Sequence, residues 1–363
     1  MKRLKFVALM FLCAVYCGSV RAQTTVFSDD FGPPSSIFTS NGQIGASAFS
    51  VTSTGIDWGA RRNFSPEQLE LTNDISGTPN VNGWVFASTP TGSFGSPYNT
   101  TLSSNTGLVT WTFNMRQIRT DPAGFSAGAY GVAFILGGTS TTAATVGDGY
   151  AVVLGQTGNI DPVRLLRYTN GLQGSLTEII TSNTLGLTDF GNHYTTVRVT
   201  YNPSNNLWEL FVRNDGTFAF DDPTSPGMVS QGAVADNTFT GTPLTALGAY
   251  WQGSTVTTQT AFFDNLGVTV VNAPTAADTS VGGRVSTADG RGIRNAAVII
   301  SGGNLPESRR ALTGSFGYYR FDGLPAGETY VLSVGSKRYS FSVPARTVTL
   351  NDELSNVDFT ALP

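Results

Sequence analysis

Few residues in this chain are of the types that catalyse reactions. Glycoside hydrolysis needs two carboxyl groups about 5 to 9 Å apart across a cleft, yet the chain has only seven glutamates, and Glu67 and Glu70 have the spacing of a turn or a helix start. His193 is the only histidine, so a Ser-His-Asp triad or a histidine metal site would depend on it alone. It follows Asn192 and precedes a predicted strand, which is typical of a loop residue. The sequence predicts that the protein is not an enzyme.

Aromatic residues offer a different chemistry, because their rings can stack on the apolar faces of sugars. The candidate ligand-binding rings are Trp58, Tyr250 and Trp251. Trp58 stands beside two arginines, which favours exposure, whereas burial in the core is the alternative for Trp251. Trp111 and Trp208 alternate with other apolar residues, so we expect both in the core.

The elements that would position these residues are β-strands. Only 13% of the residues are charged, and short apolar runs alternate with clusters rich in Gly, Asn, Asp and Pro. Many strands without intervening helices predict an all-β sandwich or jelly roll. We expect strands at residues 109–115, 131–136, 150–154, 163–168, 195–201, 208–213, 244–251 and 260–271.

The order and spacing of these runs resemble the concanavalin A-like, or laminin G-like, jelly roll over residues 23–271. The runs at 149–154, 163–168, 194–201 and 207–212 carry the resemblance, together with an opening strand at 26–31 and a closing strand at 261–270. The Glu-x-Asp-x-x-Glu strand common in glycosidases of this scaffold does not occur. Asp148 precedes Gly149, similar to the Asp-Gly strand entrance of sugar-binding lectins, so Asp148 joins the ligand-binding candidates.

This resemblance also implies a cation site. First and last strands of such jelly rolls usually pair, which would bring together Asp29, Asp30, Asp264 and Asn265. Carboxylate and amide oxygens are the ligands that Ca²⁺ prefers, so these residues are candidate calcium ligands. The alternative is that the aspartates are solvent-facing ends of edge strands. A second acidic group, at residues 215, 221 and 222, has the spacing of a turn.

The last eighty or so residues have a different pattern, with short apolar runs separated by Asp-Gly and Pro-Ala-Gly turns. The segments at 281–300 and 316–334 are similar to the carboxypeptidase regulatory-like domain, a transthyretin-like accessory module. The resemblance implies a small Ig-like β-sandwich at residues 281–363 that serves as a spacer or anchor. A linker is expected at 272–280.

The N-terminus predicts export. A basic start, an apolar run and small residues before Gln23 form a signal peptide over residues 1–22, cleaved near Ala22. Both cysteines, Cys13 and Cys17, lie within it, so the exported chain has no disulfide, which favours a bacterial envelope or medium. A membrane-spanning helix needs about 20 consecutive apolar residues, and no apolar run in the sequence is that long. We therefore expect a secreted, extracellular or cell-envelope protein without a transmembrane segment.

The net charge of each part of the chain indicates which kinds of partner it can bind. Residues 23–279 hold 8 Arg and no Lys against 18 acidic residues, a net charge of −10, whereas residues 280–363 hold 9 basic and 7 acidic residues, a net charge of +2. An acidic surface repels phosphate backbones, so we expect no nucleic-acid partner. Such a surface is compatible with cations.

Together these patterns predict a secreted, non-catalytic binding protein. The jelly roll would recognise a glycan or another cell-envelope component, with the C-terminal module as spacer or anchor. One alternative is a structural or adhesive surface protein with a protein partner. Another is a glycoside hydrolase whose acid pair only the folded chain would reveal.

Overall fold

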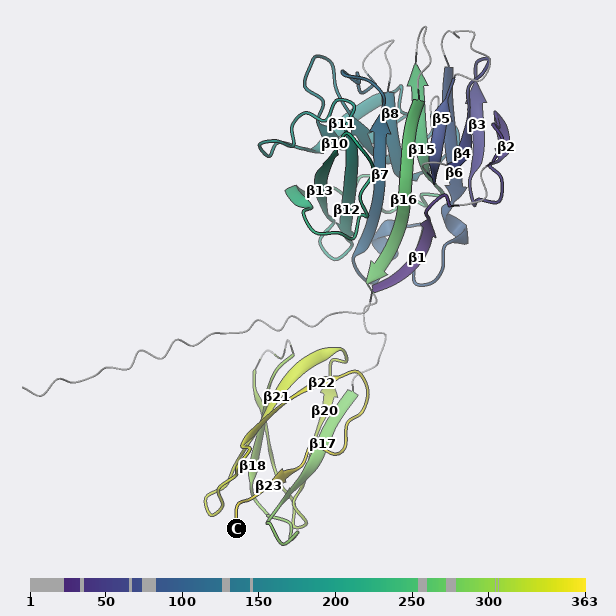
Figure 1. The fold of residues 1–363 in the computed structure, drawn as a ribbon. Coiled ribbons are helices and arrows are strands. Elements are labelled where there is room, and N and C mark those ends of the chain that lie inside the picture. The colour runs from purple at the N-terminus through teal and green to yellow at the C-terminus, as the bar shows by residue number, and fades with distance from the viewer. Residues whose placement is uncertain are drawn as a thin grey trace, which may run out of the picture. The chain divides into compact units, whose positions relative to one another are not determined.

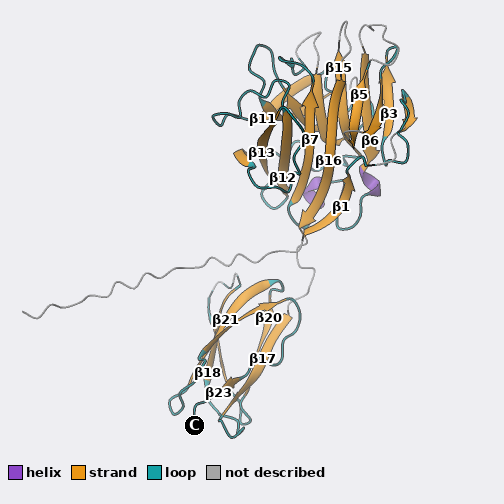
Figure 2. Ribbon diagram, viewed as in Figure 1, coloured by secondary structure: helices purple, strands orange, loops and turns teal. Residues whose placement is uncertain are grey.

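The structure, a computed structural model, is all-β, and its chain divides into two compact units at Gln23–Asn272 and Ala273–Pro363. The described residues are 23–32, 36–64, 67–73, 83–125, 131–143, 146–253, 260–271, 279–303, 305 and 307–363. The predicted signal peptide and nearly all of the predicted linker lie outside them. Within the described part, strands are joined by loops and by two short 3-10 helices, η1 (Thr91–Ser93) and η2 (Leu102–Ser104) (Figure 2). None of the helices described there is long and apolar enough to cross a membrane.

The N-terminal unit is a sandwich of two antiparallel eight-stranded sheets (Figure 1). Sheet A contains the first and last strands of the unit, β1 (Gln23–Asp29) and β16 (Thr260–Val271), which pair with each other. Its remaining strands follow the order β14 (Val229–Ala235), β13 (Leu207–Gly216), β12 (Tyr194–Asn202), β7 (Val109–Gln117), β16, β5 (Glu67–Thr72) and β4 (Gly59–Phe64).

Sheet B forms the other layer of this unit. Its strands follow the order β11 (Ser175–Thr181), β10 (Val163–Thr169), β9 (Gly149–Leu154), β8 (Gly131–Gly138), β15 (Ala246–Gly253), β6 (Gly83–Pro90), β3 (Ser50–Thr54) and β2 (Asn41–Gln43). Strands β8, β9 and β15 are buried at every position. Both faces of the centre of sheet B are therefore covered.

Two hydrophobic clusters account for this burial. The larger one lies between the sheets and contains Trp111 and Trp208, which stack with ring centroids 5.7 Å apart. The smaller one contains Trp84, Tyr168 and Tyr250, together with Leu172 from a loop. Because alternate residues of a strand point to opposite faces, β15 contributes Trp251 to the first cluster and Tyr250 to the second.

A local irregularity in sheet A shapes its outer face. The first part of β16 pairs with β5 and the second part with β1. Between them the pairing of β16 with β7 shifts register at Asp264–Gly267, and Asn265 has a φ of 49°. Such a bulge leaves residues out of the ladder and redirects their side chains. The ends of β1 and β5 meet β16 around this bulge.

The C-terminal unit is a small sandwich with its own core. One sheet contains β20 (Tyr318–Leu324), β17 (Thr279–Ser286) and β23 (Phe359–Thr360). The other contains β19 (Arg309–Leu312), β18 (Ala297–Gly302), β21 (Glu328–Gly335) and β22 (Ala345–Leu350). Tyr330 is fully buried in this core, and its hydroxyl donates to the carbonyl of Pro325 at 2.9 Å.

Candidate functional site

The tryptophans predicted to stack on sugar are core residues. Trp58 is 1% exposed and Trp251 is fully buried, and their rings stack with centroids 4.4 Å apart. The expected exposure of Trp58 is therefore wrong. Trp58 directly precedes β4. Trp58, Ala60 and Arg62 are all buried, so the inward face of this segment includes an arginine. For this reason the sequence pattern did not reveal that Trp58 is buried.

Tyr250 is also unavailable as a sugar platform, because it is fully buried beneath Phe125, with ring centroids 5.7 Å apart. Its hydroxyl donates to Gln252 Oε1 at 3.0 Å. Asp148 is half-buried, and its Oδ1 accepts from the backbone N–H of Asn170 at 3.0 Å. The contacts of Asp148 close a loop of sheet B. The four ligand-binding candidates therefore do not form one site.

The residues predicted to bind calcium do gather in one region. In the ladder of β1 with β16, Asp29 lies opposite Leu266, next to Asp264 and Asn265. Backbone N–H groups hold all three aspartates: Phe31 N–H donates to Asp29 at 2.9 Å, Gly32 N–H to Asp30 at 3.1 Å, and Asn265 N–H to Asp264 at 2.8 Å. Within the described residues, no three His, Cys, Asp or Glu side chains are grouped so as to hold a metal ion. Calcium binding by these residues stays a prediction.

Burial, with a smaller contribution from neighbouring charges, raises the pKa of two of these acids. Burial raises the pKa of Asp264 to about 7, and the nearby charges of Asp30, Glu67 and Asp29 add to this. Burial also raises the pKa of Asp29, against the lowering effects of the Phe31 N–H and the Arg62 guanidinium. Proton uptake near neutral pH is therefore a property of this part of the molecule.

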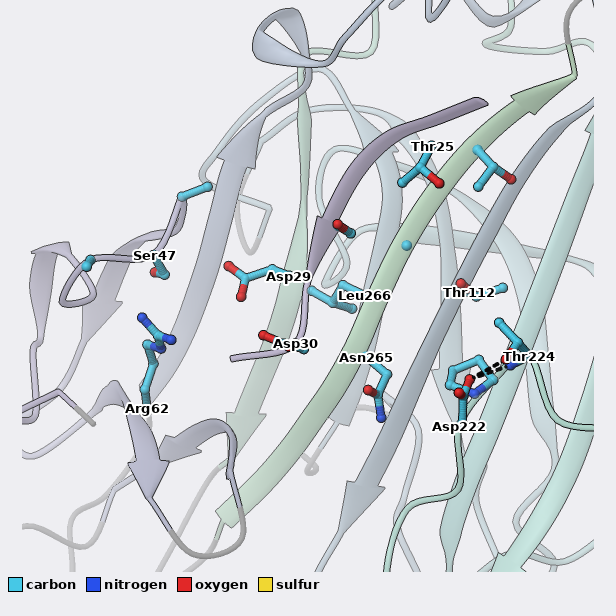
Figure 3. A pocket seen from close by; sticks show the side chains of 16 residues that line it. Thr25, Asp29, Asp30, Ser47, Arg62, Thr112, Asp222, Thr224, Asn265 and Leu266 are labelled. Carbon is cyan, nitrogen blue, oxygen red and sulfur yellow. Dashed lines mark hydrogen bonds between the residues drawn. The ribbon is translucent and has the colours of Figure 1, made fainter. Parts of the chain in front are cut away.

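An open pocket of about 680 Å³ lies beside these acids. On its floor, Thr112, Gly267 and Thr269 alternate with core residues of β7 and β16, so the pocket is on the face of sheet A that points away from sheet B. We call it the outer-face pocket (Figure 3). Its lining consists of Thr25, Ser28, Asp29, Asp30, Ala46, Ser47, Ala48, Arg62, Thr112, Asp222, Pro223, Thr224, Asn265, Leu266, Gly267 and Thr269.

One wall of the pocket is a loop fixed by hydrogen bonds. Asp222 Oδ1 accepts from both the N–H and the hydroxyl of Thr224 at 2.7 Å, and Arg213 donates to the Asp222 carbonyl at 3.2 Å. Asn114, fully buried on β7, links this loop to the bulge, because it donates to the Asp221 carbonyl at 3.0 Å and accepts from Asn265 Nδ2 at 2.8 Å. This wall is therefore held in place before a ligand arrives.

The opposite side of the pocket contains Asp29, Asp30 and Arg62 (Figure 3). Asp29 pairs with Leu266 and Arg62 with Leu69, both core residues, so here the pocket reaches beyond the outer face to the edge of sheet A. Arg62 is only 6% exposed, and its guanidinium donates to the carbonyl of Gly32. Sequence reasoning missed Arg62, Thr112 and Gly267 as site residues. Their role depends on the packing of strands far apart in the chain. Of the residues that line the pocket, the sequence singled out Asp29, Asp30 and Asn265 as candidate calcium ligands and Asp222 as part of an acidic turn.

The arrangement has a distinct binding chemistry. Among the described residues, the lining combines carboxylates, an amide, several hydroxyls and the Arg62 side chain, and none of them is aromatic. Such a surface recognises a ligand by hydrogen bonds rather than by stacking. Asn214 Nδ2 lies 2.9 Å from His193 Nδ1, which places the only histidine in a structural contact outside the pocket lining.

Comparison with known proteins covers both units. Over 65% of this chain, two solved structures are similar. They are arcelin-5, a lectin-like defense protein from Phaseolus vulgaris (15% identity, 97% of that chain, TM-score 0.35), and lectin I-B4 from Griffonia simplicifolia (12% identity, 99% of that chain, TM-score 0.37). The seed lectin of Lotus tetragonolobus is similar over the same share (10% identity, 99% of that chain, TM-score 0.40). No curated protein matches the sequence. Residues 280–362 match the family of the carboxypeptidase regulatory-like domain, and the C-terminal unit is a domain of this type.

Proposed function

We propose that this is a secreted, non-catalytic binding protein whose N-terminal unit holds a glycan of the cell envelope in the outer-face pocket. The C-terminal domain would act as its spacer or anchor. The observation that carries the proposal is the pocket itself, with its lining of carboxylates, hydroxyls and an amide. A saccharide presents many hydroxyls, each of which can donate and accept a hydrogen bond, and these groups complement such a lining.

Gly267 offers a direct test, because a side chain at this position would fill the floor of the pocket. A Cβ there would lie 2.8 Å from Thr112 Oγ1, the end of a side chain that can rotate away, and no backbone atom is as near. We expect Gly267→Val to fold normally and to weaken glycan binding at least about ten-fold, equivalent to about 1.4 kcal/mol. Binding of the purified protein to a polysaccharide panel measures this effect.

Gly241→Val is the matched control. Gly241 is exposed, no atom lies within 4 Å of its added Cβ, and it is not part of the pocket lining. This variant should bind as the wild type does. Equal binding by all three proteins would place the ligand elsewhere, and uniformly negative panels would remove the glycan role and favour a protein partner.

Glycoside hydrolysis is a second candidate, favoured by the raised pKa of Asp264 close to Asp29 and Asp30. Carboxyl groups with separated pKa values are how glycosidases assign acid and base roles. Asp264, however, is not among the residues that line the pocket, and a general acid must reach the bond that it protonates. Release of reducing ends from the bound polysaccharide, abolished in Asp264→Asn, would establish hydrolysis in place of simple binding.

A further inference from the structure

One end of the C-terminal unit gathers exposed apolar side chains. It lies where β17 ends, away from Thr279, and Figure 1 shows the C-terminus of the chain there. We call it the distal end, and it consists of the loops at 287–296, 313–317 and 336–344, the strand ends beside them and residues 361–363. Its large hydrophobic side chains are 41–73% exposed: Leu312, Phe316, Tyr318, Tyr339, Val343 and Leu362. No other large hydrophobic side chain that the structure describes in this unit is more than 40% exposed.

Hydrogen bonds hold the loops of the distal end together. Arg284, on β17, joins two of them, because its Nε donates to the carbonyl of Phe316 at 2.9 Å and a terminal nitrogen donates to the carbonyl of Gly290 at 3.1 Å. The N–H of Leu362 donates to the carbonyl of Ser340 at 2.8 Å, which ties the C-terminus to another of the loops. The exposed apolar side chains are therefore presented by a fixed framework.

Positive charge gathers at the same end. The loops of the distal end contain four basic residues and one acidic residue, a net charge of +3: Arg291, Arg294, Lys337, Arg338 and Asp289. Arg291 pairs with Asp289 at 2.8 Å, whereas no carboxylate that the structure describes forms an ion pair with the other three basic side chains. The connections that leave the opposite end, at 303–308, 325–327 and 351–358, contain four acidic residues and no basic residue. The small domain is therefore polar in charge along its length.

A partner for this end must offer both anionic and apolar groups. An anionic polysaccharide would pair with the cations, but it has no hydrocarbon to cover leucine and valine side chains. An uncharged apolar partner would leave the cations without a counter-charge. A bilayer that contains anionic lipids offers phosphate groups at its surface and hydrocarbon just beneath them. Aromatic side chains are favoured at this depth.

We propose that the distal end docks the C-terminal domain on the surface of an anionic phospholipid bilayer. The exposed apolar side chains enter the interface, and Arg294, Lys337 and Arg338 contact the lipid phosphates. This inference rests on the anchor role proposed for the domain and names the partner of that anchor. It does not depend on glycan binding by the N-terminal unit.

The first test measures binding to lipid vesicles by the chain without its predicted signal peptide. Vesicles of phosphatidylcholine alone are compared with vesicles that contain phosphatidylcholine and phosphatidylglycerol in equal parts. We expect the protein to bind the anionic vesicles at least about ten-fold more tightly, and added salt to weaken this binding. Equal binding to both kinds of vesicle, or binding to neither, would overturn the proposal.

A pair of double variants tests the role of charge at the distal end. Lys337→Gln with Arg338→Gln removes two exposed charges there, and we expect affinity for the anionic vesicles to fall at least about ten-fold. Arg309→Gln with Arg320→Gln is the matched control, because it removes the same charge from side chains that contact Asp322. An equal loss in both double variants would show that only net charge matters and would contradict docking by the distal end.

The exposed rings are tested in the same way. Phe316→Ala with Tyr318→Ala should weaken binding to anionic vesicles about ten-fold, because less apolar surface enters the interface. Phe218→Ala is the control, since Phe218 is 94% exposed but belongs to the N-terminal unit. Both should bind polysaccharide as the wild type does. If the double variant lost polysaccharide binding and kept vesicle binding, the distal end would be a glycan site and the membrane assignment would be wrong.

A fluorophore measures entry into the bilayer directly. Both cysteines lie within residues 1–22, so a cysteine introduced into the rest of the chain is a single labelling site. Phe316→Cys, labelled with a solvent-sensitive fluorophore, should shift its emission to shorter wavelength on anionic vesicles and be quenched by spin-labelled lipids. The same label on Phe218→Cys should show neither change. Vesicle binding without a change in the Phe316→Cys signal would overturn the proposed insertion.

Discussion

Replacing Trp251 with alanine should lower the free energy of unfolding of the N-terminal unit by about 3 to 5 kcal/mol, the range for large aromatic side chains removed from a core. Trp251 is fully buried, stacks on Trp58 at 4.4 Å and lies at the centre of sheet B. Its removal leaves a cavity between the sheets that rigid strands cannot close. Denaturant unfolding followed by tryptophan fluorescence measures the change.

Fluorescence is a selective probe here, because all five tryptophans lie in the N-terminal unit. Leu185→Ala is the control, since Leu185 is 97% exposed and should change stability by no more than about 0.5 kcal/mol. If Trp251→Ala kept wild-type stability but lost glycan binding, the ring would be a sugar platform and its assignment to the core would be wrong.

The second large effect is a pH-dependent gain in stability from Asp264→Asn. The pKa of Asp264 rises from 3.8 to about 7 in the folded protein, so the folded state binds a proton that the unfolded state has released between these values. Wild-type stability should therefore fall as pH rises toward and through 7. An asparagine can still accept the Asn265 N–H but carries no charge.

We expect Asp264→Asn to be more stable than the wild type by about 1 to 3 kcal/mol at pH 8, after allowance for partial solvent screening, and nearly equal to it at pH 4. Unfolding by urea at several pH values measures the difference. If the difference between the two proteins stayed constant across this range, Asp264 would not titrate there and the acids would not be crowded as described.

Much of the strand layout could be predicted because apolar runs and turn residues mark it directly. The runs expected at residues 109–115, 163–168 and 260–271 correspond to β7, β10 and β16, and the other five expected runs also overlap strands. Pairing of the first and last strands of the N-terminal unit is confirmed. Strands such as β11 and β14 were missed because they are largely exposed and their sequences have no clear apolar alternation.

Exposure of single side chains was harder to predict. Tyr250 belongs to the face of β15 opposite Trp251, and in a two-layer sandwich that face would be exposed. Here Phe125 and Leu172, from loops far away in sequence, cover it. Local patterns contain no information about such loop packing, so the availability of a ring to a sugar could not be deduced.

The residues of the candidate site were also hard to predict, because they come from segments far apart in the sequence. Its lining comes from six separate segments between residues 25 and 269, and the shape of the pocket depends on the bulge at Asn265 and on the loop around Asp222. The sequence did indicate which acids lie near β16, because its resemblance to a jelly roll implied that the first and last strands pair. Arg62 was not predicted as a site residue, because the burial of an arginine cannot be inferred from neighbouring charges alone.

The most direct test of the account is a crystal structure of the protein with the oligosaccharide that it binds best. We predict a sugar ring over Gly267 in the outer-face pocket, with its hydroxyl groups within hydrogen-bonding distance of the polar side chains that line the pocket. A sugar bound at the loops of sheet B, with the outer-face pocket empty, would contradict it.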